Sequence, residues 1–401
     1  MPVLQDYNQF QGRHWETGSI GNFYAYRGVT APHTNQPYSE AMLLGLSGGV
    51  VMSYFSFAYQ GHDPHVAMLT RNTFNPMDTI LERLGVQQFI RHTSRPQKGV
   101  ANLIDTLADG EPAIVWADMF SLPYNDLGYD EGMWAMFPII VYGYDETNQA
   151  VYLADRAQVP LIISPQTLAQ ARGRVKKDKY RILTLDRPDP DKLPAAVQKG
   201  IWDCIKLYTE APPKGSKNNF GLAAFNWWAK LLTKPKQRLS WAKVFPPGDK
   251  MYAGLTSAFN HLAIFGKDGG AERDLYADFL DEASLVLAKP ALKSAAEAFR
   301  RSVQAWDELG RALLPDQIAP FGQTRELMLR RHRLFLEQGA GSLAERQALT
   351  AQLDQIKAAV AADFPLSQGE VAIFCENLAG QLLKIHDIEL AAVTAMQEAM
   401  A

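Results

Sequence analysis

Cysteine is nearly absent from this sequence, which has only Cys204 and Cys375 in 401 residues. Two thiols this far apart argue against a disulfide framework and against a cysteine-built metal site. His62 and His65 lie three residues apart, but they have no third ligand at a convincing spacing and are interpreted as solvated loop residues, as is His92. We therefore expect no metal and no other cofactor. Each cysteine lies among apolar helical residues without a neighbouring histidine, which predicts buried, unreactive thiols.

Strong net charge and long apolar runs are also missing. The formal charge is −3 at pH 7, which leaves no global basic field and makes nucleic acid and anionic membranes unexpected partners. No stretch approaches the roughly 20 apolar residues of a membrane span, and the first residues lack the basic start and apolar segment of a signal peptide. Together with the scarcity of cysteine, this predicts a cytoplasmic protein.

Apolar residues make up 47% of the chain, enough to bury the cores of two or three domains. Residues 1–186 show helical patterns first and strand patterns later. The apolar runs at 139–144 and 150–154 flank a polar segment and predict a β-hairpin. Further strands are expected at 113–117, 161–164 and 180–185, and helices at 39–46, 78–84 and 100–107. The first domain is therefore predicted to be α+β with a largely antiparallel sheet.

A proline-rich, charged segment at 186–194 predicts the boundary between two domains, 1–186 and 187–401. The second domain is predicted to be all-α, with apolar faces at 271–288 and 291–314 and a basic, proline-bracketed loop at 234–248. Ser367 and Glu370 have the spacing of a capping box at a helix start.

Two motifs allow both a functional and a structural interpretation. Gly45-Leu-Ser47-Gly-Gly49 fits the nucleophile elbow of a hydrolase, but that motif needs a strand before the serine, and the preceding residues look helical. Close backbone packing at a helix end is the simpler use of these glycines. The basic run at 172–181 either docks an acidic partner or forms a solvated face, the more common case.

Five motifs occur in an order that resembles the N-terminal domain of the butirosin-biosynthesis acyltransferase family (BtrH-like). The second half resembles the helical domain of unknown function that commonly follows it, in Asn219-Phe-Gly-Leu222 and in Gly270-x-x-Arg273-x-Leu-Tyr276. The five N-terminal motifs are Gly12-Arg-His14-x-Glu16-Thr-Gly, Ser39-Glu40-Ala-Met-Leu-Leu-Gly45, Asp118-x-x-x-Leu122-Pro-Tyr124, Val141-Tyr-Gly-Tyr-Asp-Glu146 and Tyr152-Leu-Ala-Asp-Arg156.

The resemblance implies a papain-like α+β fold in which a cysteine nucleophile passes an acyl group from a carrier-protein thioester to an amine. A histidine deprotonates the thiol and an acidic residue orients the histidine. In this chain the cysteine position is Trp15 and the histidine position is Phe137, and only the acid, Asp155, matches. Gln9 or Gln11 corresponds to an oxyanion-hole glutamine.

Because tryptophan cannot attack a thioester and phenylalanine cannot carry a proton, the resemblance predicts a degenerate site. Three functions stay open. The first is a protein that binds a small molecule or an acyl-carrier-type protein in the former cleft, and the predicted binding residues are His14, Trp15, Glu16, Tyr124, Tyr129, Trp134, Phe137 and Asp155. The second is an enzyme that forms amides by positioning two substrates, not a peptidase. The third is a structural component that forms a homo-oligomer through its helical domain.

Overall fold

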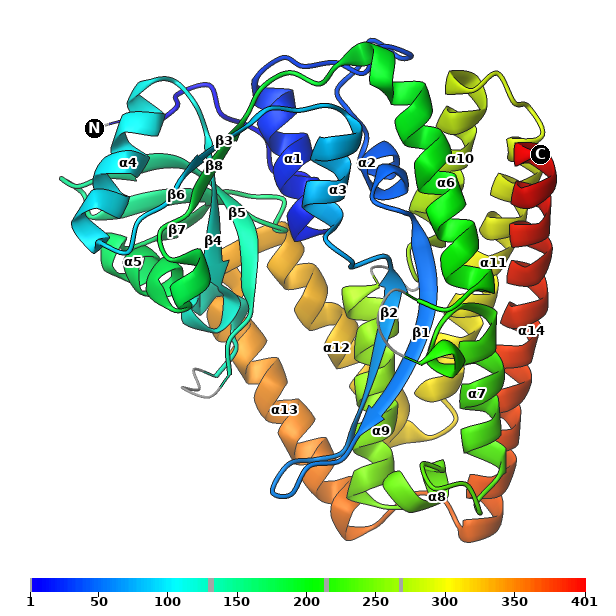
Figure 1. Ribbon diagram of the computed structural model, residues 1–401. Helices are drawn as coiled ribbons and strands as arrows, with labels where there is room; N and C mark the ends of the chain where they lie inside the picture. Colours follow the sequence, from blue (N-terminus) through cyan, green and yellow to red (C-terminus); the bar gives the residue numbers. More distant parts are fainter. Residues whose placement is uncertain (1, 129–132, 213–215, 267–269) are drawn as a thin grey trace. The chain divides into compact units, whose positions relative to one another are not determined.

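The computed structural model describes residues 2–128, 133–212, 216–266 and 270–401 (Figure 1). Contacts within the chain divide it into two compact units, each built from three stretches. Unit 1 consists of Met1–Leu43, Met77–Leu193 and Arg331–Ala348, and unit 2 of Leu44–Pro76, Pro194–Arg330 and Leu349–Ala401. These units are defined by contacts, so the division into two domains, 1–186 and 187–401, stays a prediction. By its contacts, 44–76 belongs to unit 2, although it lies in the N-terminal part of the sequence. Residues 331–348 belong to unit 1, although they lie in the C-terminal part.

Unit 1 contains a six-stranded sheet in which every pairing is antiparallel. The strand order is β3-β8-β4-β5-β6-β7. The hairpin at 139–154 and the largely antiparallel sheet are confirmed, whereas β3 was not predicted. The strands are β3 (Gln88–Arg91), β4 (Ala113–Asp118), β5 (Met136–Asp145), β6 (Ala150–Ala154), β7 (Leu161–Ile163) and β8 (Ile182–Leu185).

A polar turn closes the β5–β6 hairpin. The carboxylate of Asp145 accepts hydrogen bonds from the backbone N–H groups of Thr147 (3.0 Å) and Asn148 (3.1 Å). The Asn148 side chain donates a third bond to the same carboxylate (2.7 Å), and these bonds lower the Asp145 pKa. This is the local chemistry by which aspartate and asparagine favour turns.

Apart from the helix that begins at Trp15, the helices of unit 1 begin where the sequence offers a cap or a proline at the first helical position. Ser39 accepts from the N–H of Met42 (2.9 Å) at the start of α2, and Ser164 accepts from the N–H of Thr167 (3.1 Å) in α5. The predicted helices at 39–46, 78–84 and 100–107 are confirmed. The helices are α1 (Trp15–Tyr26), α2 (Glu40–Leu46), which continues into unit 2, α3 (Pro76–Arg83), α4 (Pro96–Ala108) and α5 (Pro165–Gly173), with the 3-10 turns η1 (Met119–Ser121), η2 (Pro123–Asn125), η3 (Lys176–Asp178) and η4 (Pro190–Lys192).

Unit 2 is mainly helical, and the whole C-terminal half of the chain is helical as predicted (Figure 1). It also holds an antiparallel hairpin that was not predicted, β1 (Val50–Phe57) with β2 (His65–Arg71). His65 therefore begins a strand and stacks beside Phe57, so its assignment to a solvated loop was wrong. The helices are α6 (Leu193–Thr209), η5 (Lys217–Asn219), α7 (Gly221–Thr233), α8 (Trp241–Val244), α9 (Asp249–Phe259), the π-helical η6 (Asn260–Phe265), α10 (Arg273–Val286), α11 (Leu292–Leu313), α12 (Ala319–Gln338), η7 (Gly339–Ser342), α13 (Leu343–Ala362) and α14 (Gln368–Met400), with the predicted capping box of Ser367 and Glu370 confirmed.

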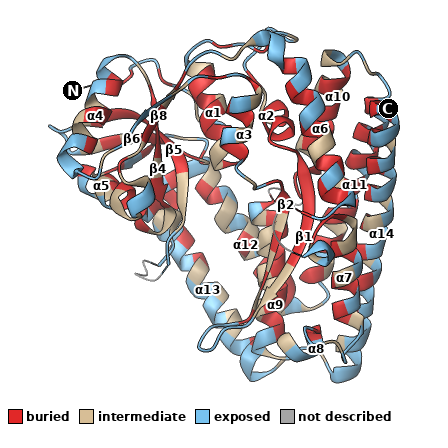
Figure 2. Cartoon of the chain, viewed as in Figure 1, coloured by how far each residue is buried: buried red, intermediate tan, exposed pale blue. Residues whose placement is uncertain are grey.

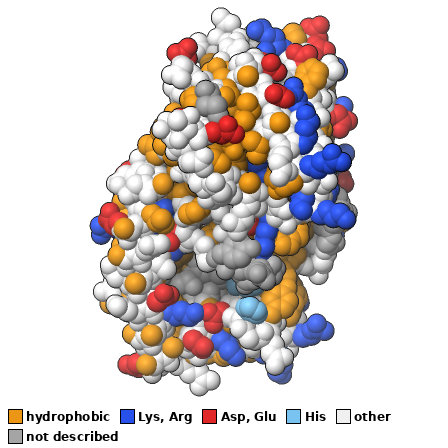
Figure 3. All heavy atoms as spheres, turned by 90° about the vertical axis from the view of Figure 1, so that its left-hand side faces the viewer, with side chains coloured by type: hydrophobic (Ala, Val, Ile, Leu, Met, Phe, Trp, Pro, Cys, Tyr) orange, Lys and Arg blue, Asp and Glu red, His pale blue; other side chains and the backbone are white. Residues whose placement is uncertain are grey.

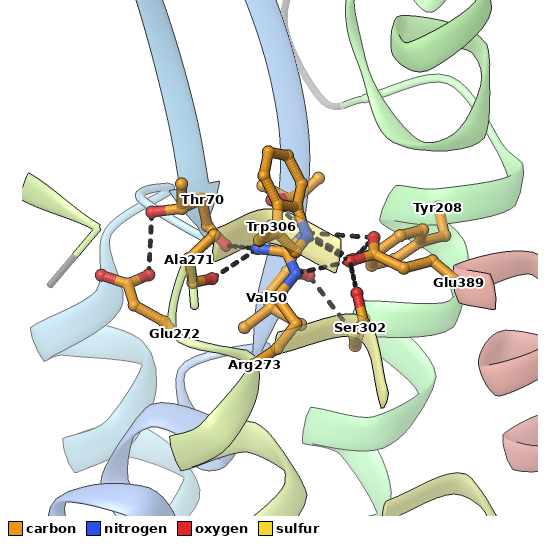
Figure 4. A network of polar contacts seen from close by, with 11 residues as sticks. Val50, Thr70, Tyr208, Ala271, Glu272, Arg273, Ser302, Trp306 and Glu389 are labelled. Atoms are coloured by element: carbon orange, nitrogen blue, oxygen red, sulfur yellow. Dashed lines mark hydrogen bonds and ion pairs between the residues drawn. The ribbon is translucent and has the colours of Figure 1, made fainter. Parts of the chain in front are cut away.

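A fully buried ion pair lies inside unit 2, between Arg273 of α10 and Glu389 of α14 (Figure 4). The Nε of Arg273 is 2.8 Å from a carboxylate oxygen of Glu389, and neither side chain is exposed. Ser302 and Trp306 of α11 each donate to the same carboxylate at 2.7 Å, and Tyr208 of α6 donates at 2.7 Å.

The same arginine ties the hairpin to the helices, because it donates to the carbonyl oxygens of Val51 in β1 (3.1 Å) and Thr70 in β2 (2.8 Å). A buried charge is tolerated only with such full pairing and hydrogen bonding. The arginine of the Gly270-x-x-Arg273 motif thus has a structural role in this chain.

The Gly45–Gly49 motif lies between helix α2 and strand β1, the reverse of the order that a nucleophile elbow requires. The Ser47 hydroxyl is buried and donates to the carbonyl oxygen of Leu44 (2.7 Å). Gly49 has a φ of +71°, and a Cβ there would lie 2.4 Å from the Tyr276 ring. Close packing, the simpler interpretation, is confirmed.

Two basic segments contain buried side chains (Figure 2). Arg172 is 1% exposed and donates to the carbonyl oxygen of Tyr180 (3.0 Å), so the run at 172–181 is not solvated throughout. Burial lowers the Arg172 pKa to about 10. In the segment 234–248, Trp241 is buried and its indole N–H donates to the Tyr54 hydroxyl (2.9 Å). This basic segment is therefore anchored by aromatic side chains.

Candidate functional site

The N-terminus of α1 is held in place by the carboxylate of Glu40. That carboxylate accepts from the backbone N–H groups of Arg13 (2.8 and 2.9 Å) and His14 (3.0 Å) and from the Thr17 hydroxyl (2.8 Å). An acidic group at this end of a helix compensates unpaired N–H groups and the helix dipole. Trp15 is the first residue of the helix, so Glu40 fixes the place from which its side chain projects.

Two neighbouring strands carry the other two residues that the resemblance predicts for a triad. Phe137 lies near the start of β5, and Asp155 follows the last residue of β6. In the antiparallel pairing of β5 with β6, Ile140 lies opposite Ala154. Asp155 follows Ala154, so the same register places it opposite Ile139. Since side chains alternate between the faces of a sheet, Phe137, Ile139 and Asp155 share one face. α1 packs on β5, and the Ser19 hydroxyl donates to the carbonyl oxygen of Pro138 (3.2 Å).

The rings of Trp15 and Phe137 stack on each other. Their centroids are 3.9 Å apart, with an angle of 14° between the planes. The guanidinium of Arg156 lies 4.0 Å from the centroid of the Trp15 ring. Such a cation over an aromatic face is attracted by the charge distribution of the ring.

The carboxylate of Asp155 accepts hydrogen bonds from two neighbouring residues. The Tyr124 hydroxyl donates to its carboxylate (3.0 Å), and Arg156 donates through its backbone N–H (2.7 Å) and its Nε (3.3 Å). Burial and the neighbouring Asp155 carboxylate raise the pKa of Tyr124 well above its ordinary value. Tyr124 is therefore a neutral hydrogen-bond donor at neutral pH.

The C-terminal stretch 331–348, which belongs to unit 1, adds a further layer to this cluster. The guanidinium of Arg156 lies 5.1 Å from the ring centroid of Phe335, and that of Arg346 lies 5.4 Å from the same centroid. Arg346 also donates to the carbonyl oxygen of Tyr124 (2.7 Å). The result is a column of alternating rings and guanidinium groups in the order Phe137, Trp15, Arg156, Phe335 and Arg346, which we call the aromatic–arginine column.

A small cavity lies beside the column. A cavity of about 10 Å³ is lined by residues of α1 and by the end of β6. That volume corresponds to about one water molecule. Its lining residues are His14, Trp15, Gly18, Ser19, Asn22, Ala154 and Asp155.

The structure thus brings Trp15, Phe137, Asp155, Tyr124 and His14 into one cluster. Their roles in binding, and that of the half-buried Glu16, stay predictions. Trp134 is 57% exposed, and Tyr129 lies outside the described residues. Gln9 contacts the neighbouring Asn8 side chain, and Gln11 is exposed, with its backbone bonded to Asn22.

Sequence reasoning did not find four residues of the site, namely Arg156, Glu40, Phe335 and Arg346. The first two stand inside family motifs, so the motifs were an available signal. Phe335 and Arg346 lie in an ordinary helical pattern about 180 residues away, and nothing local marks them.

The two cysteines belong to unit 2. Cys204 is fully buried, and burial raises its pKa to about 12. Cys375 is 7% exposed, and burial raises its pKa to about 11. The prediction that both are buried helix residues is confirmed. Across the described ranges, no three His, Cys, Asp or Glu side chains are grouped to hold a metal ion.

Figure 3 shows acidic and basic side chains interspersed with apolar ones on one face. None of the helices that the structure describes combines the length and the apolar character that a membrane span requires.

Two family models match the chain. The model described as "Butirosin biosynthesis protein H, N-terminal" matches residues 14–156, which contain Trp15, Phe137 and Asp155. The model "Domain of unknown function (DUF4872)" matches residues 166–317, which contain Arg273. Phe335 and Arg346 lie beyond both matches, and no curated protein matches the chain. The chain thus matches, in the predicted order, the butirosin biosynthesis protein H N-terminal domain family over residues 14–156 and this domain of unknown function over residues 166–317.

Proposed function

We propose that this chain is a degenerate member of an acyltransferase-like biosynthetic family, which binds at the former active site and does not transfer acyl groups through a cysteine. The observation that carries the proposal is the Trp15–Phe137 stack, with ring centroids 3.9 Å apart. Two rings in contact occupy the positions where the family has its nucleophile and base. Neither ring can perform the corresponding step.

The geometry also supports a papain-like ancestry. A nucleophile at the first position of a helix, a base on the adjacent strand and an acid on the next strand form the arrangement that such enzymes use. Trp15, Phe137 and Asp155 have these three locations.

The binding function requires the column to open. A cavity of about 10 Å³ holds no metabolite, so a ligand has to displace a ring or a guanidinium group. The ligand chemistry that fits is a small molecule with a planar apolar part, stacked in place of a ring, and an anionic group paired with Arg156. An acyl-carrier-type protein that presents such a group is the corresponding partner.

Replacing Trp15 by alanine separates binding from a purely structural role. If the indole only fills the old cleft, the free energy of unfolding falls by about 3 kcal/mol, at the lower end for a large aromatic because Trp15 is partly exposed. If the ring is part of a binding site, the loss is smaller, and thermal shifts that metabolites induce in the unchanged protein disappear. Chemical denaturation and a metabolite panel measure the two effects.

Ile162→Ala, a change to an exposed side chain of β7, is the matched control and should alter neither quantity much. A loss of about 3 kcal/mol with no ligand found would reject the binding function. That result would favour a purely structural role for the Trp15 ring, with which the small cavity is also consistent.

Acyl transfer through a cysteine is tested directly with the unchanged protein. Incubation with the acetyl thioester of N-acetylcysteamine should leave the intact mass unaltered, because burial raises the pKa of Cys204 to about 12 and of Cys375 to about 11. A stoichiometric acyl adduct on either thiol would overturn the proposal. Amide formation from the thioester and an added amine, without an adduct, would instead support transfer by positioning of two substrates.

A further inference from the structure

Strand β3 forms one edge of the sheet in unit 1. In the described part of the chain it pairs with β8 on one side and with no strand on the other. Phe89 is 48% exposed and Ile90 is 52% exposed. An edge strand with exposed apolar side chains and unpaired backbone groups is a template for another strand.

The hydrogen bonds to β8 show which backbone groups of β3 are directed outward. The N–H of Asp186 donates to the carbonyl oxygen of Gln87 (3.0 Å), and the same register continues through Gln88↔Leu185 to Arg91↔Ile182. In an antiparallel ladder, successive residues turn their polar groups to opposite sides. Phe89 and Arg91 therefore face β8, and Gln88 and Ile90 direct their N–H and C=O groups to the open edge.

The side chains of β3 differ in chemistry between the two faces of the sheet. Phe89 and Arg91 are on one face, where they line a cavity of about 240 Å³. Asp109 and Glu111 contribute carboxylates to that cavity, and Arg91 lies 3.8 Å from Asp109. Ile90 is on the opposite face. One face of the edge thus combines an aromatic ring, a cation and two acids, and the other carries Ile90 and Gln88.

We propose that β3 pairs with β3 of a second copy of this chain, antiparallel and across a two-fold axis at Ile90. A two-fold axis perpendicular to a sheet keeps each side chain on its own face, so a residue can only oppose one from the same face. With the axis at Ile90, the outward N–H and C=O groups of the two Ile90 residues form a pair of hydrogen bonds.

This register matches the side chains as well as the backbone. Phe89 of one copy opposes Arg91 of the other, which sets a guanidinium beside an aromatic ring and near the carboxylates of Asp109 and Glu111. On the opposite face of the sheet, Ile90 of one copy opposes Ile90 of the other. The self-complementary order of these residues favours a second copy over an unrelated extended peptide, and it joins two six-stranded sheets into one.

Disulfide trapping tests the register. In a hydrogen-bonded antiparallel pair the Cα atoms are about 5.5 Å apart, within the range that a disulfide spans. Under mild oxidation, Ile90→Cys should give a covalent dimer, because the natural thiols are buried. Ile162→Cys is the matched control, since Ile162 is 53% exposed on β7, the opposite edge of the same sheet. The Ile162→Cys variant should run as a monomer in non-reducing denaturing electrophoresis.

Sedimentation velocity over a concentration series provides the second measurement. The unchanged protein should dimerise, and Ile90→Lys should weaken the dimer at least about tenfold, because the two ammonium groups would face each other at the axis. Ile162→Lys should dimerise normally. Circular dichroism establishes that both variants fold. A monomer at every concentration, or equal crosslinking through both positions, would overturn the proposal.

Discussion

Replacing Glu389 by glutamine is expected to lower the free energy of unfolding by about 3–5 kcal/mol, because it leaves the buried guanidinium of Arg273 without a counter-charge. Glutamine has nearly the same size as glutamate, so the decrease in the free energy of unfolding measures the missing charge and not a change in packing. Ser302 and Trp306, which both donate to one carboxylate oxygen, also lose a charged acceptor. Urea unfolding measures the difference.

The control is Glu376→Gln, an exposed change on the same helix α14, which should stay within about 0.5 kcal/mol of the unchanged protein. Replacing both Arg273 and Glu389 by methionine should cost less than the single change, because no charge is then buried. A cost below about 1 kcal/mol for Glu389→Gln would contradict the importance of the pair.

The same pair predicts a dependence on pH. Burial opposes the charge of Glu389, but Arg273 and the hydrogen bonds from Trp306 and Ser302 outweigh it and lower the pKa of Glu389. A carboxylate with a lowered folded-state pKa contributes stability above its unfolded pKa of about 4.3, and the contribution is lost as the pH falls below that value. Stability should therefore fall more steeply below about pH 4 in the unchanged protein than in Glu389→Gln.

On the proposed function, a thiol at position 15 together with an imidazole at position 137 is expected to create thioester chemistry. The double variant Trp15→Cys, Phe137→His sets a thiol at the first position of α1 and an imidazole on β5, near Asp155. The helix N-terminus and the imidazole favour the thiolate. Removing the indole also enlarges the cavity of about 10 Å³ beside it.

The expected product is a stoichiometric acyl adduct with the acetyl thioester of N-acetylcysteamine. The thiolate sulfur forms a bond with the acyl carbon, the original carbon–sulfur bond breaks, and the leaving thiolate takes the proton that the imidazole holds. Intact-mass measurement followed by peptide mapping locates the adduct. The single variants are the matched controls: Trp15→Cys should acylate much more slowly, and Phe137→His should not acylate. A folded double variant without an adduct would contradict the assignment of the triad positions.

Local chemistry made much of the secondary structure predictable. The hairpin at 139–154 follows from two apolar runs around an aspartate-led turn, and the start of α14 follows from the Ser367–Glu370 capping box. Strands β1 and β2 were missed because their alternation is weak. Val50–Tyr54 is an unbroken buried run that also fits a buried helix.

The composition of the site shows the limit of prediction from local pattern. Trp15, Phe137 and Asp155 could be paired in advance only because family motifs related them. Arg156 stood inside a motif without an assigned role. Phe335 and Arg346 come from 331–348, and only folding brings that stretch into unit 1 beside the Arg156 guanidinium.

The sequence by itself determined most of the helices and strands and the resemblance to known domains, because these depend on residue identity and short-range periodicity. Only the tertiary structure decided that the rings of Trp15 and Phe137 stack and that Arg156 covers the Trp15 ring. It also decided that Arg273 and Glu389, 116 residues apart, form one buried pair. These features depend on long-range packing, in which a side chain's partner is set by the fold and not by its neighbours in the chain.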